Sequence, residues 1–170
     1  MRKIPVFVSC PTDLNPEQEQ KRKTIDAILS DLQLEPRALG KSDYPVDYPL
    51  KEVYSVAKHC SGGIILGFEQ MYLKSGIIKR GIGTKEKAVN DICLPTEWNN
   101  LEAGILFGMN LPLLIFKEDT IRGGVFDLGN TEIYVHSMPC EKPDNKTLDA
   151  LKQVFLRWHA RVSEKYYEFP

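Results

Sequence analysis

The sequence predicts an α/β fold in which a parallel, doubly wound sheet of about five strands carries helices on both faces. Three observations lead to this class. Short runs rich in Val, Ile and Phe alternate with patterns that have the period of an amphipathic helix. Residues 62–68 are almost entirely apolar, which is typical of a central strand covered on both sides. A length of 170 residues suits one domain, residues 1–170, because a second core would need roughly 100 residues of its own.

The first predicted elements are a strand over residues 3–9 and a helix after it. Asn15 suits the N-cap of this helix, Pro16 suits its first turn, and Gln18 completes a capping box. The apolar side chains at helical spacing are Ile25, Ile28, Leu29 and Leu32.

The next elements are an edge strand, a loop and a helix. Residues 34–39 suit a short strand, which Pro36 confines to the edge of the sheet. Residues 40–49 hold two prolines, two tyrosines and two aspartates, so they are predicted to form a surface loop of the kind that often touches ligands. Residues 50–59 are predicted to form a helix. Its expected apolar side consists of Leu50, Val53, Tyr54 and Ala57.

Residues 71–95 have no clear periodicity and are long for a connection, so we interpret them as a functional or mobile insertion. Thr96 then begins a helix that extends to about residue 109, and residues 111–116 are predicted to be a buried strand. The last expected elements are a strand over residues 131–137 and a C-terminal helix over residues 144–166. The apolar stripe of that helix is Leu148, Leu151, Phe155, Trp158 and Val162.

Composition and charge exclude several classes of partner. The 22 basic and 23 acidic residues give a net charge of -1, so no nucleic-acid or anionic-membrane partner is expected. No apolar run approaches the ~20 residues of a membrane-spanning helix, and the first three residues are too short for a secretory signal. The four cysteines lack the spacing of a metal site or a disulfide framework. We therefore expect a cytoplasmic protein with reduced thiols and no metal.

A doubly wound sheet binds ligands at the carboxyl ends of its strands, where the strand order reverses. The candidate site should therefore collect the segments that follow the strands. These are residues 9–13, 40–48 and 68–69, together with the start of the helix at Thr96.

Glu102 is the most informative candidate residue, because every other residue in the range 101–109 is apolar or glycine. A carboxylate on a buried helix is costly unless it is paired or faces a polar cavity. Trp98 lies four residues earlier and shares its helix face. A carboxylate beside an aromatic ring can stabilise the oxocarbenium-like transition state of glycosyl transfer. The alternative is a structural role, in which Glu102 hydrogen-bonds Ser9, the insertion or a neighbouring main chain.

The succession of these motifs resembles the Toll/interleukin-receptor (TIR) domain and the related nucleoside 2-deoxyribosyltransferase group. The resemblance spans roughly residues 4–137, and its most specific element is Trp98-x-x-x-Glu102 between two buried strands. The other motifs that carry it are residues 6–9, the proline-rich loop 40–49, residues 60–67 and residues 111–114. The resemblance implies a flavodoxin-like sheet.

The resemblance also implies roles for individual residues. Glu102 would be the catalytic glutamate of an NAD glycohydrolase or ADP-ribosyl cyclase or transferase, with Trp98 beside it. In the transferase group a comparable glutamate opens a helix, and Glu102-Ala103-Gly104 fits that pattern. The remaining predicted substrate contacts are Ser9 and Cys10 near the nucleotide, Asp43, Tyr44 and Asp47 in the covering loop, and Phe68, Glu69 and Asn99.

The sequence leaves three functions open. The first is NAD cleavage, which needs no general acid because nicotinamide leaves as a neutral molecule. NAD would then be a substrate, with no further cofactor, and the resemblance implies a role in bacterial antiviral signalling. The second is a nucleoside or nucleotide deoxyribosyltransferase or N-glycosidase. The third is a catalytically silent nucleotide-binding signalling module. A homo-oligomer or an activating protein partner is expected, because unrestrained NAD loss is toxic.

Overall fold

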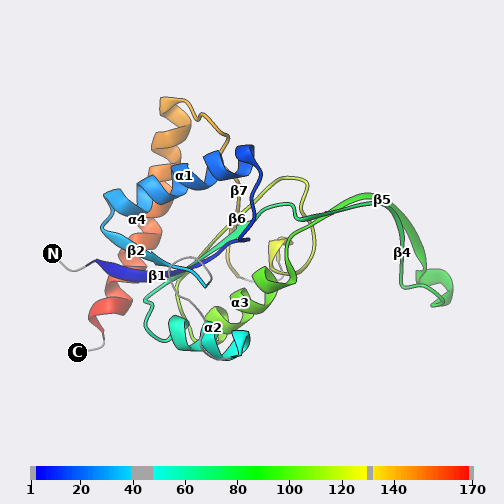
Figure 1. Cartoon of the computed structure of the whole chain (residues 1–170), viewed down its shortest axis with the longest axis horizontal. Coiled ribbons are helices and arrows are strands. Elements are labelled where there is room, and N and C mark those ends of the chain that lie inside the picture. Colours follow the sequence, from blue (N-terminus) through cyan, green and yellow to red (C-terminus); the bar gives the residue numbers. More distant parts are fainter. Residues whose placement is uncertain (1–2, 40–47, 130–131, 169–170) are drawn as a thin grey trace.

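A parallel sheet of five strands forms the centre of the structure, a computed structural model that describes residues 3–39, 48–129 and 132–168 (Figure 1). The strand order is β2-β1-β3-β6-β7, and every neighbouring pair is parallel. This order is flavodoxin-like, and it confirms the predicted α/β class. The strands are β1 (Ile4–Ser9), β2 (Leu34–Arg37), β3 (Gly63–Gly67), β6 (Leu113–Lys117) and β7 (Val135–Ser137).

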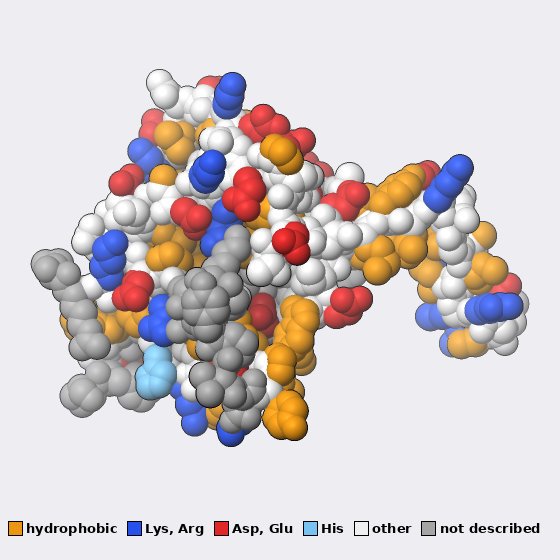
Figure 2. Space-filling view, in the orientation of Figure 1, with side chains coloured by type: hydrophobic (Ala, Val, Ile, Leu, Met, Phe, Trp, Pro, Cys, Tyr) orange, Lys and Arg blue, Asp and Glu red, His pale blue; other side chains and the backbone are white. Residues whose placement is uncertain are grey.

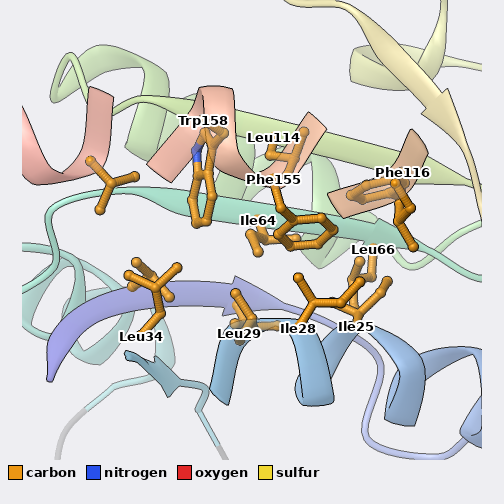
Figure 3. Packing of buried hydrophobic residues seen from close by; sticks show 14 of the residues in the cluster. Ile25, Ile28, Leu29, Leu34, Ile64, Leu66, Leu114, Phe116, Phe155 and Trp158 are labelled. Atoms are coloured by element: carbon orange, nitrogen blue, oxygen red, sulfur yellow. The ribbon is translucent and has the colours of Figure 1, made fainter. Parts of the chain in front are cut away.

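Helices cover both faces of this sheet, as predicted. On one face α1 (Pro16–Asp31) and α4 (Asn145–Tyr167) pack over a core cluster that includes Phe116, Phe155 and Trp158 (Figure 3). On the other face α2 (Pro49–Ala57) and α3 (Glu97–Gly108) enclose a second cluster with the short 3₁₀ segment Gly124–Phe126. The central strand β3 therefore lies between two apolar layers, which agrees with the continuous apolar run at residues 62–68.

The predicted helix caps are confirmed. The Asn15 side chain accepts a hydrogen bond from the Gln18 backbone N–H at 2.9 Å, and the Asn15 N–H donates to the Gln18 side chain at 3.2 Å. Thr96 and Asp144 cap α3 and α4 in the same way, each through its side-chain oxygen. These local bonds satisfy N–H groups that no helix can pair internally, so they set where each helix begins.

Three predictions about burial or length need correction. In α2 the buried side chains are Val53, Val56 and Ala57, whereas Leu50 and Tyr54 are 50% and 47% exposed. The predicted burial of α3 holds for one side only, because this helix covers the sheet with that side and nothing in the described chain covers its outer face. Leu101 and Phe107 are 43% and 54% exposed there. The last strand is shorter than predicted and begins at Val135.

A two-stranded antiparallel ribbon occupies the insertion predicted near residues 71–95. Its strands are β4 (Met71–Ile78) and β5 (Lys87–Leu94), which pair from Met71 with Leu94 to Ile78 with Lys87. Figure 1 shows this arm projecting from the body of the molecule. The segment is therefore regular although its sequence has no clear periodicity, and its interpretation as a functional or mobile insertion stays a prediction. Both faces of the arm are exposed along most of its length, so no buried side imposed an alternating pattern on the sequence.

Two glycines of β3 let neighbouring elements approach the sheet closely. A Cβ atom on Gly63 would lie 2.7 Å from Leu106 of α3, and one on Gly67 would lie 2.5 Å from the Phe126 ring. This close approach brings α3, and with it Glu102, against the carboxyl end of the sheet. Within the described residues, no helix combines the length and apolar character needed to cross a membrane, and all four cysteines are free thiols.

Candidate active site

A cavity of about 280 Å³ lies at the carboxyl ends of β1 and β3, next to the start of α3. The chain leaves β1 toward β2 on one side and reaches β3 on the other, so this is the point where the strand order reverses. This cavity therefore lies where the fold class predicts a ligand site. The described residues that line it are Cys10, Pro11, Thr12, Asp13, Leu39, Pro49, Val53, Gln70, Thr96, Trp98, Asn99 and Glu102.

Glu102 contributes the only carboxylate that α3 directs into this cavity, and its residue surface is 9% exposed. Burial raises the pKa of the Glu102 carboxyl from 4.5 to about 7, and a hydrogen-bonding interaction with the Ser9 hydroxyl lowers that pKa in part. Burial disfavours the charged form because the cavity wall solvates it less well than water does. Glu102 therefore exchanges its proton near neutral pH. The alternative of a structural role for Glu102 is also supported in part, because the carboxyl interacts with Ser9, one of the partners expected for that role.

Asn99 fastens the start of α3 to the sheet. Its side-chain Nδ2 donates to the Ser9 Oγ at 2.8 Å and to the Leu66 carbonyl at 3.4 Å. At the same residue, the Thr96 hydroxyl donates to Asn99 Oδ1 at 3.2 Å, and the Asn99 N–H donates to Thr96 Oγ1 at 3.3 Å. Asn99 is 1% exposed, so these bonds satisfy a polar group that has no access to water. The bonds hold β1, β3 and α3 in one arrangement around Glu102.

Trp98 supplies an aromatic wall to the same cavity. Its side chain lines the cavity one helical turn before Glu102 and is 43% exposed. An indole with one covered and one accessible side can stack against a base or the apolar face of a sugar. The predicted pairing of a carboxylate with an aromatic ring on one helix face is therefore present.

The loop after β1 forms the opposite wall. Cys10 lines the cavity and interacts with the guanidinium of Arg22, which is 7% exposed and also bonds Asp26 at 3.3 Å through Nε. Within the described residues, Arg22 Nη1 has no hydrogen-bond partner. Gln70 closes this side, because its Nε2 donates to the Asp13 carbonyl at 3.3 Å. Hence a buried cation lies just behind the cavity wall.

Three predicted substrate contacts do not line this cavity. Ser9 is 1% exposed, and its Oγ accepts a hydrogen bond from Asn99 instead. Phe68 is completely buried in the core cluster beneath α1 and α4, because its side chain points to that face of the sheet. Glu69 lines a neighbouring hollow instead, where its N–H donates to Glu118 Oε2 at 2.8 Å. The predictions for Ser9, Phe68 and Glu69 are therefore wrong for this cavity. The predicted loop residues Asp43, Tyr44 and Asp47 lie outside the described residues.

Sequence reasoning missed four residues that line the cavity: Leu39, Pro49, Val53 and Gln70. Leu39 follows the edge strand, Pro49 is the first residue of α2, and Val53 lies in the middle of that helix. Their residue types carry no catalytic chemistry, so no motif could single them out. Gln70 directly follows Glu69, and only the direction of the backbone after β3 decides which of the two side chains faces the cavity.

An ionised carboxylate beside an aromatic ring can stabilise positive charge that develops on a bound molecule. The described residues contain no group of three His, Cys, Asp or Glu side chains placed to hold a metal ion. The chain was compared with protein-family models, with curated proteins and with solved structures, and none of them matches it.

Proposed function

We propose that this protein cleaves the N-glycosidic bond of a ribosyl nucleotide, with NAD as the substrate, and that Glu102 is the catalytic residue. The observation that carries the proposal is the Glu102 carboxyl, which lines a cavity beside Trp98 while burial raises its pKa to about 7. A cavity of about 280 Å³ is near the lower end of small-molecule sites. It would hold the reacting ribose and its leaving group rather than a whole dinucleotide.

The reaction breaks the bond between ribose C1 and the pyridinium nitrogen of nicotinamide. The bonding electron pair goes to that nitrogen, so nicotinamide leaves as a neutral molecule and needs no proton. The ionised Glu102 carboxylate stabilises the positive charge that develops on the ribose. Water then adds its oxygen to C1 and releases one proton, and the products are ADP-ribose and nicotinamide.

The ionisation state of Glu102 links pH to this activity. A carboxylate with a pKa near 7 is about half ionised at neutral pH in the free protein. A cationic substrate beside it favours the ionised form. We therefore expect kcat/KM for NAD to rise with pH through about 7 and then to level off.

The raised pKa of Glu102 also favours a second candidate, cleavage or transfer of an ordinary nucleoside base. Such a base needs a proton as it leaves, and a carboxyl that is still protonated near pH 7 can supply it. For this reaction kcat/KM would fall as pH rises through about 7. The direction of the pH profile therefore distinguishes the two reactions.

The experiment incubates the concentrated protein with NAD or with 2′-deoxynucleosides between pH 5 and pH 9 and follows nicotinamide and free base by chromatography. We expect nicotinamide, and we expect Glu102→Gln to lose about 100-fold or more in kcat. Glu97→Gln is the matched control, because Glu97 is an exposed carboxylate on the same helix that does not line the cavity. Full turnover in Glu102→Gln would remove the catalytic assignment. Binding of either compound without turnover by the wild type would favour a signalling module.

A further inference from the structure

The arm formed by residues 71–94 exposes apolar side chains that its own chain does not cover. Its two strands pack chiefly on each other, and a two-stranded ribbon is only marginally stable in water without further packing. Large apolar side chains are exposed along its whole length, from the root to the tip. They are Met71 (46%), Tyr72 (55%), Leu73 (38%), Ile77 (54%), Ile78 (48%) and Ile82 (55%).

The arm also carries a charge opposite to that of the remaining chain. It has five basic and two acidic residues, so its net charge is +3, whereas the rest of the chain has a net charge of -4. Figure 2 shows basic and apolar side chains together at the end of the arm. The basic residues are Lys74, Lys79, Arg80, Lys85 and Lys87, and all of them are exposed.

The body offers an acidic surface with the complementary charge. Two adjoining hollows of about 460 and 380 Å³ share Glu17, Lys21, Glu118 and Asp119. We call the combined surface the acidic hollow. Lys21 forms ion pairs with Glu17 and Glu118, and Lys142 adds a second cation. The carboxylates of the hollow are Glu17, Glu69, Glu118, Asp119 and Glu141, so its net charge is -3.

We propose that residues 71–94 are an association arm through which two copies of this chain bind each other, with the basic arm of each copy lying in the acidic hollow of the other. Glu69 places the hollow beside the root of the arm of the same chain. Eight strand residues extend about 27 Å, so the tip lies far from its own hollow. Only a second copy brings tip and hollow together.

Two other occupants fit these observations less well. An anionic lipid surface would meet the tip but would leave Met71, Tyr72 and Leu73 at the root uncovered. A nucleic acid that followed the arm to its root would meet the acidic hollow, which repels phosphates. Pairing of two arms without the hollows would bring two charges of +3 together with no opposite charge between them. A second copy bound by reciprocal exchange places the net charge of +3 on each arm against the net charge of -3 in a hollow.

The test is the oligomeric state of the full chain, measured by sedimentation velocity over a range of protein concentrations and NaCl concentrations. We expect a dimer that weakens as salt rises, because salt screens the charge contacts. Reversing the arm charges with Arg80→Glu, Lys85→Glu and Lys87→Glu should weaken association by about tenfold or more. Reversing the hollow with Glu17→Lys, Asp119→Lys and Glu141→Lys should do the same. An equimolar mixture of the two reversed proteins should associate again.

The matched control reverses three exposed lysines on other surfaces, Lys23, Lys146 and Lys152, and it should leave association unchanged. Circular dichroism checks that every variant is folded. A wild type that stays monomeric at all concentrations would overturn the proposal, and so would a dimer that neither reversal weakens. Binding of phosphatidylserine vesicles or duplex DNA that depends on the arm, without dimer formation, would overturn it in favour of that partner.

Discussion

At the scale of single residues, two opposing effects set the pKa of the Glu102 carboxyl in the candidate site. The carboxyl gains a hydrogen-bonding interaction with Ser9 but loses most of its hydration. The loss dominates, which is why the pKa rises. The same burial that makes this residue useful to a reaction near neutral pH therefore costs the folded protein stability whenever the group is ionised.

The first prediction concerns this cost. Between about pH 4.5 and 7 the folded protein holds a proton on Glu102 that the unfolded chain has released, so the contribution of Glu102 to stability is fully present below about pH 4.5 and is lost as pH rises through about 7. The full loss is up to about 3 kcal/mol. Because Gln cannot ionise, Glu102→Gln should be more stable than the wild type at pH 8 and about equal to it at pH 5, as measured by urea unfolding. An equal effect at both pH values would contradict the buried, protonated state of Glu102.

The second prediction concerns Asn99, whose amide joins α3 to two strands. Asn99→Ala removes the buried donor that bonds the Ser9 Oγ and the Leu66 carbonyl. We expect a loss of about 1–3 kcal/mol in the free energy of unfolding. Asn90→Ala on the exposed arm is the matched control and should change this free energy by less than about 0.5 kcal/mol. Equal effects of the two substitutions would show that the Asn99 bonds contribute little.

At the scale of elements, the spacing between β3 and its neighbours depends on glycine. The position that a Cβ atom would occupy on Gly67 faces the Phe126 ring, and the same position on Gly63 faces Leu106 of α3. A rigid ring cannot turn away as readily as a leucine side chain, so Gly67 is the more sensitive of the two positions. The absence of a side chain at these two positions therefore lets α3 and the segment Gly124–Phe126 pack close to the sheet.

The third prediction follows from this close packing. Gly67→Ala should destabilise the fold by about 1–3 kcal/mol, because the added methyl group overlaps the Phe126 ring and forces the segment Gly124–Phe126 outward. Gly76→Ala in the arm is the control, since its Cβ would meet only Val89 at an ordinary 3.6 Å. Thermal unfolding of both variants measures the difference. A Gly67→Ala protein as stable as the control would show that the ring has room to move.

The elements also show where local patterns suffice. The helices α1, α3 and α4 begin at the caps that Asn15, Thr96 and Asp144 predict, because capping depends on residues within one turn. The exposed side of α2 and the outer face of α3 were not predictable, since the same apolar residues would suit a buried face if another layer covered them. Which face is covered depends on the packing of distant segments.

At the scale of the whole molecule, a layered body and an isolated arm differ in how they are held together. The body has two apolar cores, one on each side of the sheet. The arm relies on strand pairing and on local contacts such as the hydrogen bond of the Tyr72 hydroxyl to Asp91. A partner that covers the arm would supply the packing that its own chain does not.

The fourth prediction is a difference in hydrogen exchange. In dilute protein, backbone amides of β4 and β5 should exchange much faster than those of β3 and β6, because exposed strand pairs open locally without unfolding a core. As the protein concentration rises, protection of the arm should increase while that of the sheet stays constant. Mass spectrometry of peptides from both regions measures this. Arm amides as protected as those of β3 at high dilution would contradict the prediction.

The sequence by itself determined the α/β class, the order of the strands and helices of the layered body, and the position of Glu102 and Trp98 on one helix face. These features follow from local periodicity, capping and the cost of one carboxylate in an apolar helix. Only the tertiary structure decided that Asn99 meets Ser9 from 90 positions away, that Phe68 and Glu69 leave the cavity, and that residues 71–94 form a regular arm. The physical reason is that burial and side-chain direction depend on the register and packing of segments far apart in the chain.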